Sequence, residues 1–277
     1  MKTVIKIGTS TLTHESGRVN LRRVETLCKI VSDMMNAGNE IILVSSGAIG
    51  LGVGKLRLGE RPHDIAGKQA CAAVGQCELM YTYDKLFSEY GQTVAQILLT
   101  APDLSCEDRH EKFVNTTEKL LSFGVLPIIN ENDTVATEEI VFGDNDTLAA
   151  KIAVAVKAEL LVLLSDIDGL YTADPRKNAD ATLISEVHEL TPEILALAGK
   201  AGSSRGTGGM ETKLRAASIV TSSGCDMIIA NGASPELLYD IFDGKAVGTR
   251  FYASKEGANL WKMLTKPYNF AGLQSKR

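Results

Sequence analysis

Lys6 is the first residue whose position needs a chemical explanation. It lies within the apolar run TVIKI, residues 3–7, and Gly8 follows two residues later. An unpaired ammonium buried in such a run is costly, so the side chain must reach solvent, pair with a carboxylate or meet a bound anion. Reaching solvent would be favoured on an edge strand. Because this strand is predicted to be central and a glycine follows it, we favour the anion.

A second lysine, Lys213, follows a cluster of glycines. The sequence GTGGM, residues 206–210, leads directly into a predicted helix, and Lys213 lies in its first turn. A flexible loop, a positive helix end and a lysine together suit a polyphosphate. The chain contains neither a GxxxxGK[ST] phosphate-binding loop nor a GxGxxG dinucleotide fingerprint. The alternative, an ordinary mobile surface loop, stays open.

The sequence GDNDT, residues 143–147, offers a carboxylate that could serve both lysines. It stands at a predicted helix start, where Asp and Asn are also common as caps. Three consecutive candidates, ending at Asp146, exceed what capping requires. One carboxylate between Lys6 and Lys213 would hold two mutually repelling ammonium groups in position, and we assign this role to Asp146.

Further polar residues follow the ends of predicted strands. In open parallel sheets, ligands bind beyond the carboxyl ends of the strands, where loops and helix N-termini present backbone N–H groups. Small, amide or hydroxylated side chains stand there at residues 8–10, 45–48 and 130–133. After a later strand, Ser165, Asp166 and Asp168 suit contacts with a nucleotide. Each of these loops alone could equally be an ordinary turn.

Composition argues against several classes of function. With 34 acidic and 29 basic residues, no face can be uniformly basic, so nucleic acid and membrane surfaces are not expected partners. No apolar stretch reaches the roughly 18 residues that span a bilayer, and no signal peptide is apparent. The five cysteines form no CxxC pair and the four histidines are scattered. We therefore expect a cytoplasmic protein with reduced thiols and no histidine-based hydrolysis.

The elements that must position these residues alternate between strand and helix. Short β-rich runs recur along the chain, and most are separated by segments of helical periodicity. This alternation predicts an α/β fold, a three-layer sandwich with a mainly parallel central sheet between helix layers. The predicted strands are residues 3–7, 40–44, 93–98, 125–129, 160–164 and 225–230. The predicted helices are residues 21–36, 65–90, 107–123, 147–156, 192–198 and 210–223.

Two segments fall outside this alternation. Between residues 130 and 143 the sequence TVATEEIVF alternates in polarity, which predicts a β-hairpin that projects from the sheet as a lid. Near the end, an amphipathic piece around Leu260, Trp261 and Leu264 predicts a docked helix followed by a frayed end. No linker or repeat divides the chain, so we expect one domain over residues 1–255 and a short tail over residues 256–277.

Seven motifs occur together in one order: KIGTS, VSSGAIG, KQACAAVGQ, INENDTV, FGDND, SDIDGLYTADPR and GTGGMETK. In this order they resemble the amino acid kinase family, over roughly residues 2–250. The pair INEND and FGDND is the specific part, and it resembles the branch of the family that acts on free glutamate. The fold of the family, a mainly parallel sheet between helix layers, agrees with the predicted elements.

The resemblance implies phosphoryl transfer from Mg-ATP to the side-chain carboxylate of L-glutamate, the first step of proline biosynthesis. It implies that Lys6 and Lys213 flank the transferring group and that Asp146 orients them. The implied substrate contacts are Ser46, Gly47, Ala48, Asn132, Asp133 and Asn145. The implied ATP contacts are Lys6, Gly8, Ser165, Asp166, Thr207, Gly208, Gly209, Met210, Glu211, Thr212 and Lys213. The resemblance leaves the Mg²⁺ ligands open.

The chemistry of glutamate agrees with this implication. A γ-carboxylate has an ordinary pKa of about 4.3 and is ionised at neutral pH, so no general base is required. Catalysis then reduces to alignment and to neutralising charge on the transferring group. The free α-ammonium needs acceptors, which Asn132 and Asp133 provide. An acetylated amino group would not need that carboxylate.

Several implications come from the resemblance alone. Family members are commonly inhibited by L-proline and assemble as homodimers or homotetramers. Many bacterial members append a PUA domain, which resembles RNA-binding modules, but only 27 residues follow Arg250, so we expect none here. The alternatives are a kinase of the same fold that acts on aspartate, acetylglutamate or a nucleoside monophosphate, and a non-catalytic amino-acid sensor.

Overall fold

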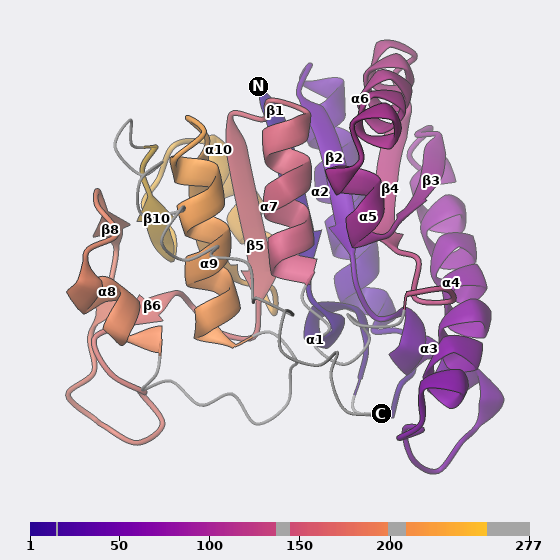
Figure 1. Ribbon diagram of the computed structural model, residues 1–277, viewed down its shortest axis with the longest axis horizontal. Helices are drawn as coiled ribbons and strands as arrows, with labels where there is room; N and C mark the ends of the chain where they lie inside the picture. The colour runs from indigo at the N-terminus through magenta and orange to yellow at the C-terminus, as the bar shows by residue number, and fades with distance from the viewer. Residues whose placement is uncertain (15, 137–144, 199–208, 254–277) are drawn as a thin grey trace, which may run out of the picture.

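Strand β1 (Lys2–Ile7) lies near the middle of an eight-stranded sheet with the order β3-β4-β2-β1-β5-β9-β10-β8 (Figure 1). This is a computed structural model, and it describes residues 1–14, 16–136, 145–198 and 209–253. Parallel neighbours flank β1 on both sides, with Lys6 opposite Val44 and Leu163. Lys6 therefore lies on a central strand, as the sequence predicts.

Six strands of the sheet run parallel to one another, and the last two at one side of the sheet, β10 and β8, run in the opposite direction. The parallel strands besides β1 are β2 (Glu40–Ser45), β3 (Val94–Leu99), β4 (Leu126–Glu131), β5 (Leu160–Ser165) and β9 (Asp226–Asn231). Strand β10 (Thr249–Phe251) pairs antiparallel with β9 and parallel with β8 (Glu186–Val187). A separate antiparallel pair joins β6 (Leu170–Tyr171) to β7 (Leu183–Ile184).

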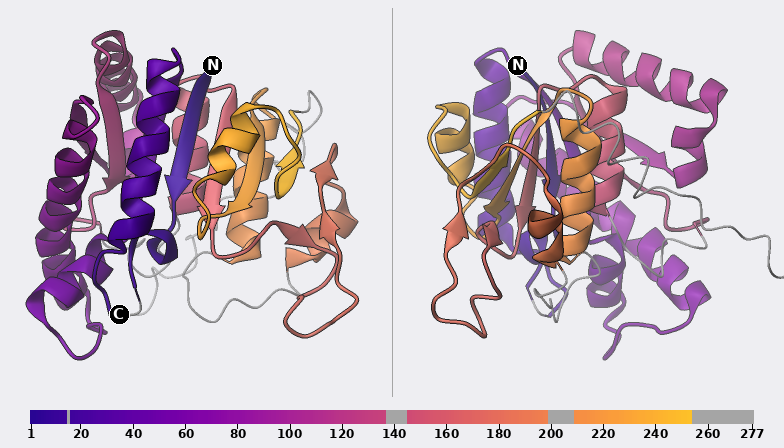
Figure 2. Two further views of the ribbon diagram at one scale, coloured as in Figure 1. Left: turned by 180° about the vertical axis from the view of Figure 1, so that it is seen from behind. Right: turned by 60° about the vertical axis from the view of Figure 1, so that its left-hand side comes forward.

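Helices cover both faces of the sheet (Figures 1 and 2). The layer at the front of Figure 1 contains α5 (Ala101–Ser105), α6 (Glu107–Ser122), α7 (Asn145–Ala155), α8 (Pro192–Ala196) and α9 (Met210–Thr221). The layer behind contains α1 (Thr9–Leu12), α2 (Leu21–Asn36), α4 (Ile65–Ser88) and α10 (Leu237–Phe242), and α3 (Ala48–Leu56) packs along α4.

Side chains of β1 alternate between these two layers. Ile5 and Ile7 pack in the core formed with α2 and α4, whereas Val4 packs in the core formed with α7 and α9. Because side chains two residues apart point to the same face of a strand, Lys6 points toward α7 and α9. This alternation aims the Lys6 ammonium at the layer that carries Asp146 and Lys213.

The predicted fold class is confirmed, and each predicted strand and helix agrees with the structure to within two residues at either end. Helix α3 was missed because its glycines suggested a loop. A Cβ at Gly52 would stand 1.9 Å from the carbonyl oxygen of Cys71, and one at Gly75 would stand 1.7 Å from that of Ala48. The glycines therefore let the backbones of α3 and α4 touch.

Three other predictions concern the lid hairpin, the C-terminal tail and the absence of a membrane span. Most of the predicted hairpin, residues 137–144, and the predicted tail lie outside them. The part that is described, residues 133–135, forms a turn rather than a strand. Within the described ranges, no helix combines the length and apolar character needed to cross a membrane.

Candidate active site

Asp146 stands between two lysines that come from opposite halves of the chain. It occupies the first turn of α7 and is 1% exposed. Its Oδ1 lies 2.7 Å from Nζ of Lys6, and its Oδ2 lies 3.0 Å from Nζ of Lys213. The structure thus brings Lys6, Asp146 and Lys213 together at the carboxyl end of β1.

Asp146 is charged although it is buried. Burial alone would raise the pKa of Asp146, but the ammonium groups of Lys6 and Lys213 lower it well below its usual range. The carboxylate is therefore ionised at neutral pH. It holds two ammonium groups close together in a largely buried setting, and a pair of ammonium groups so placed suits a bound anion.

The surroundings of the two lysines leave room for such an anion. A Cβ added to Gly8 would stand 3.8 Å from Nζ of Lys6 and 3.2 Å from the carbonyl oxygen of Leu164. A side chain at position 8 would therefore crowd the ammonium. On the other side, α9 begins at Met210 after Gly209, which makes no side-chain cap, so the positive end of the helix adds to the charge of Lys213.

Neighbouring residues tie α9 to Asp146. The Thr212 hydroxyl lies 3.0 Å from Oδ2 of Asp146 and 2.8 Å from the carbonyl oxygen of Gly209, within hydrogen-bond distance of both. Glu211 points elsewhere and pairs with Arg215 at 3.2 Å. Thr207 and Gly208, which the resemblance also implies as ATP contacts, lie outside the described residues.

A network of neutral side chains lies beside this charged cluster. Nδ2 of Asn145 donates to the carbonyl oxygen of Ser45 at 2.7 Å, to Oγ of Ser46 at 3.0 Å and to Oδ1 of Asn130 at 3.0 Å. Asn130 in turn donates to Oε1 of Gln76 at 2.9 Å. The sequence predicted Ser46 and Asn145 but not Gln76, although the motif KQACAAVGQ contains it.

The loop at the start of α3 completes this side of the site. Gly47 has φ of 93°, in the left-handed region that favours glycine, and serves as N-cap of α3. Ala48 is the first residue of α3 and is 3% exposed. Oγ of Ser45 lies 3.1 Å from the hydroxyl of Tyr83 on α4, a contact that the sequence did not predict.

Asp133 lies in the turn after β4. Burial raises its pKa to about 6, and the positive charge of Arg61 opposes this only in part. Among the described residues, no hydrogen bond reaches its carboxylate. Its neighbour Asn132 accepts from the hydroxyl of Thr134. A half-buried carboxylate of this kind is open to a cationic ligand.

The residues after β5 divide into two groups. Ser165 is 6% exposed and donates to Oδ1 of Asp166 at 3.2 Å. Asp168 accepts from the hydroxyl of Tyr171 at 2.9 Å and from Nδ2 of Asn231 at 2.7 Å. Asp168 therefore holds the turn together, whereas Asp166 is exposed at the carboxyl edge of the sheet.

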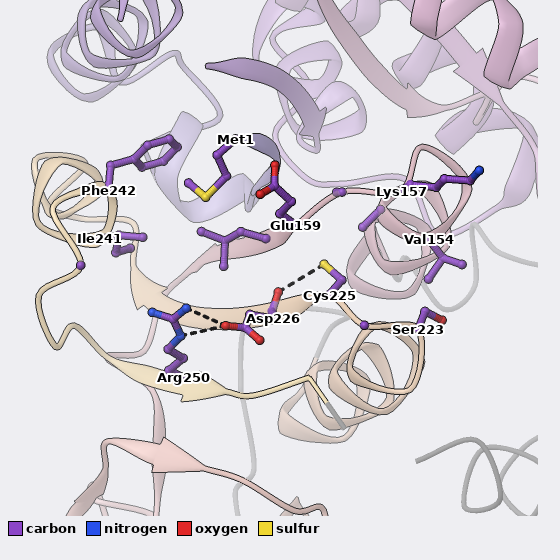
Figure 3. Close-up of a pocket in the computed structure, with 15 residues that line it drawn as sticks. Met1, Val154, Lys157, Glu159, Ser223, Cys225, Asp226, Ile241, Phe242 and Arg250 are labelled. Atoms are coloured by element: carbon purple, nitrogen blue, oxygen red, sulfur yellow. Dashed lines mark hydrogen bonds and ion pairs between the residues drawn. The ribbon is translucent and has the colours of Figure 1, made fainter. Parts of the chain in front are cut away.

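A hollow lies at the opposite, amino end of β5 and β9 (Figure 3). The arginine and the aspartate that line it pair with each other. Arg250 donates to Oδ2 of Asp226 at 2.6 and 3.1 Å, and Oδ1 of Asp226 accepts from the amide of Ala253 at 2.8 Å. Burial raises the pKa of Cys225 to about 12, so this thiol is neutral. Among the residues that line this hollow, no two lysines share a buried carboxylate as Lys6 and Lys213 do.

Comparison with known proteins shows which family the chain belongs to. A family model described as the amino acid kinase family matches residues 1–231. The chain belongs to this family. An amino acid kinase from Clostridium perfringens, a glutamate 5-kinase, is 55% identical over 256 residues, which cover 91% of this chain and 95% of that protein. The glutamate 5-kinase of Listeria monocytogenes serovar 1/2a is 51% identical over 257 residues, 91% of this chain and 93% of that protein.

Members of the amino acid kinase family differ in length. The glutamate 5-kinase of Carboxydothermus hydrogenoformans is 54% identical over 260 residues, which cover 94% of this chain but 69% of that protein. Solved structures show the shared fold. An isopentenyl phosphate kinase of T. acidophilum superposes with a TM-score of 0.59 at 18% identity, covering 91% of this chain and all of that one. Carbamate kinase from Giardia lamblia superposes with a TM-score of 0.62 at 16% identity, covering 91% and 98%.

Proposed function

We propose that this protein transfers the γ-phosphoryl group of ATP to the side-chain carboxylate of L-glutamate, giving L-glutamyl 5-phosphate and ADP. The observation that carries the proposal is its 51–55% identity to glutamate 5-kinases over about nine tenths of its length. The geometry of the site supports the same reaction, because two buried lysines lie close together around one carboxylate at the carboxyl edge of the sheet.

The transfer needs little covalent chemistry from the protein. A γ-carboxylate oxygen of glutamate attacks the γ-phosphorus, and the bond from that phosphorus to the β,γ-bridging oxygen breaks, so that ADP leaves with the electron pair. The acceptor is already ionised, and no proton has to be removed. Lys6 and Lys213 neutralise charge on the transferring group, and Asp146 fixes the distance between them. These three are the proposed catalytic residues.

The amino-acid substrate is assigned to the side of the site formed by the β2 and β4 loops. Asp133 has a carboxylate without a hydrogen bond among the described residues, and it suits the α-ammonium of a free amino acid. The proposed substrate contacts, supported by their position at the ends of β2, β4 and the start of α7, are Ser46, Gly47, Ala48, Asn132, Asp133 and Asn145.

The nucleotide is assigned to the opposite side, between β1, β5 and α9. Gly8 leaves space beside Lys6, and α9 directs its positive end toward a polyphosphate. The proposed ATP contacts within the described residues are Lys6, Gly8, Ser165, Asp166, Gly209, Met210, Glu211, Thr212 and Lys213. Thr207 and Gly208 remain part of the same proposal.

Mg²⁺ fits this arrangement as a companion of the nucleotide. Among the described residues, no three acidic, histidine or cysteine side chains gather in a cage, and Asp146 is engaged by two lysines. Mg²⁺ is commonly held by substrate phosphates with one or two carboxylates and waters, and Asp166 is an exposed candidate for such a carboxylate. When bound, the ion would withdraw charge from the phosphates.

Finer expectations belong to the same proposal. They are the placement of the reaction at the start of proline biosynthesis, feedback inhibition by L-proline, assembly into homodimers or homotetramers and a cytoplasmic location. A kinase domain over residues 1–255 is proposed likewise. All of these rest on the likeness to the family.

Trapping the acyl phosphate with hydroxylamine tests the proposed function. The protein is incubated with ATP, Mg²⁺, hydroxylamine and one acceptor at a time: L-glutamate, L-aspartate or N-acetyl-L-glutamate. We expect hydroxamate and ADP in equal amounts with L-glutamate. Product from another acceptor but not from glutamate would overturn the substrate. Binding of glutamate without ADP release would favour the non-catalytic sensor.

A further inference from the structure

The face of α4 that packs on the sheet carries two polar side chains that reach the substrate side of the site. Gln76 is 9% exposed and contacts Asn130 of β4. Tyr83 is fully buried and contacts Ser45 of β2. The two residues are seven positions apart, about two helical turns, so they lie on the same face. Helix α4 thus touches both strands that support the acceptor side.

Backbone groups fix the orientation of these side-chain amides. The backbone N–H of Glu131 donates to Oδ1 of Asn130 at 2.9 Å, which identifies that atom as the oxygen. Nδ2 of Asn130 must then be the donor to Gln76, and the Gln76 atom that faces it must be Oε1. Similarly, the carbonyl oxygen of Ser45 can only accept, so it identifies Nδ2 of Asn145. The whole relay therefore has one orientation.

The relay determines what Asn145 can offer to a ligand. All three hydrogen bonds of Asn145 use its Nδ2, which has two protons. No hydrogen bond from a described residue reaches its Oδ1. Asn145 therefore presents an acceptor. It contacts Asn130 of β4, the strand that leads into the turn with Asp133, and an acceptor on that side of the site suits the ammonium group of an amino acid.

One atom of the Gln76 side chain, Nε2, destabilises the fold. Its Nε2 is buried and has no hydrogen-bond partner within the part of the chain that the structure describes. A buried donor without an acceptor destabilises a fold. A residue kept only for packing would not need the amide. Its one satisfied atom is Oε1, the atom that orients Asn130.

We propose that Gln76 is a positioning residue for the acceptor site, which acts through Asn130 to hold Asn145 with its Oδ1 toward the α-ammonium of the substrate. This inference rests on the proposed function, because it takes the ligand to be a free amino acid. The relay serves the acceptor and not the nucleotide, since it joins β2, β4 and α7 but touches neither β5 nor α9.

The first test separates the two substrates. In Gln76→Met, Nδ2 of Asn130 loses its acceptor, and with it one of the contacts that hold the Asn130 side chain in place. We expect the KM for glutamate to rise at least tenfold while the KM for ATP stays within twofold. The midpoint of urea unfolding should change little, because the variant removes the unpaired Nε2 of Gln76 but leaves the buried Nδ2 of Asn130 unpaired instead. Gln92→Met, which removes a hydrogen bond to Asn36 on the surface, is the matched control and should change neither KM.

The second test asks for rescue by a side chain that keeps the acceptor. Gln76→Glu retains an oxygen that can accept from Nδ2 of Asn130. Burial favours the neutral form of the introduced carboxyl, which resembles the amide most closely. We expect the KM for glutamate to return to within fivefold of the unaltered protein at pH 6 and to be less restored at pH 8. Each value is taken as a ratio to the unaltered protein at the same pH, which cancels the titration of Asp133.

Three results would overturn the proposal. They are a glutamate KM within twofold of the unaltered protein in Gln76→Met, equal rises in the KM values for glutamate and ATP, and no rescue by Gln76→Glu at pH 6. Failure of the proposed function has a different signature, because the unaltered protein would then form no hydroxamate from glutamate. If it used another acceptor, the comparison of acceptor KM with ATP KM would still decide the role of Gln76.

Discussion

Strand β1 carries a lysine near each end, and the two have opposite surroundings. At the amino end, Nζ of Lys2 lies 2.6 Å from Glu118 and 3.6 Å from Glu40, and the side chains of these partners are 44% and 50% exposed. At the carboxyl end, Lys6 lies 2.7 Å from Asp146, which is 1% exposed and is shared with Lys213. Lys2 therefore has two carboxylate partners of its own, whereas Lys6 shares the carboxylate of Asp146 with Lys213.

This difference shows how one strand can provide both a structural ion pair and an anion site. Lys2 and Lys6 point to the same face of β1, so the residue type and its orientation do not separate them. The two lysines differ in the number of carboxylates that each one contacts. Glu159 adds a further carboxylate at the amino end, where its Oε1 accepts from the backbone amide of Lys2, and Figure 3 shows this residue in the hollow at that edge. Among the described residues, one lysine stands among three carboxylates at the amino end, whereas two lysines share one carboxylate at the carboxyl end.

The largest expected effect comes from removing the shared carboxylate. In Asp146→Asn two largely buried ammonium groups would lose the carboxylate that they share, and we expect a loss of about 3–5 kcal/mol in the free energy of unfolding. Urea denaturation measures it. Pyrophosphate should stabilise this variant more than the unaltered protein, because the anion replaces the carboxylate. Asp108→Asn, in an exposed pair with Lys112, is the control and should change little. Equal stability of both variants would contradict the role of Asp146.

Removing one cation should affect the reaction more than the fold. In Lys213→Met the Asp146 carboxylate still has Lys6, but the transferring group loses one of its two charge partners. We expect kcat to fall by about 10²–10³-fold, with the KM for glutamate within about threefold. Steady-state ADP release measures both. A kcat within fivefold of the unaltered protein would show that Lys213 does not contact the migrating group.

Asp133 should link glutamate binding to pH. Burial raises its pKa to about 6, so the carboxyl takes up a proton below that pH and loses its attraction for an ammonium. We expect kcat/KM for glutamate to fall as the pH drops from 7 to 5. Ionised Asp133 also opposes folding, because its pKa is higher in the folded protein than in the unfolded chain. Its contribution to the free energy of unfolding therefore decreases as the pH rises from the ordinary pKa of an aspartate to above 6.

Asp133→Asn sharpens this expectation. The variant should raise the KM for glutamate by about 10–100-fold, the range for a lost hydrogen bond to a charged group, and flatten the pH profile. Its free energy of unfolding at pH 8 should equal or exceed that of the unaltered protein. A variant that is both less stable and normal in KM would assign Asp133 to the fold instead.

The smallest effect is expected at the amino end of β1. Lys2→Met removes a lysine whose partners are exposed, so the free energy of unfolding should change by at most about 1 kcal/mol and kcat/KM by less than twofold. Thermal unfolding and the hydroxamate assay measure these changes. If Lys2→Met impaired catalysis as strongly as Lys213→Met, the contrast between the two ends of the strand would fail.

The sequence predicted the fold because its central strands are continuous apolar runs that end in glycine or polar residues. Parallel strands buried on both faces produce this pattern, and the intervening helices have clear stop signals such as Gly38. The short edge strands β8 and β10 were missed, since two or three residues carry no periodicity. Helix α3 was missed because packing against α4 overrides the low helix propensity of its glycines.

Within the candidate site, charged residues could be predicted and their neutral supports could not. A lysine inside an apolar strand needs a partner, so Lys6 leads by elimination to an acidic residue such as Asp146. Gln76 and Tyr83 give no such signal, because a polar residue on a helix is ordinarily exposed. Only the positions of β2 and β4 beneath α4 show that these two side chains are buried against the loops of the site.

The glycine contacts between α3 and α4 have a mechanical consequence. With backbone against backbone at Gly52 and Gly75, no side chain can change rotamer to absorb a displacement of either helix. The acceptor loop at Gly47 begins α3, so any shift that a ligand imposes on it passes directly into α4. That helix is 24 residues long, about 36 Å. A small movement at the substrate would therefore also displace the far end of α4, at Ser88.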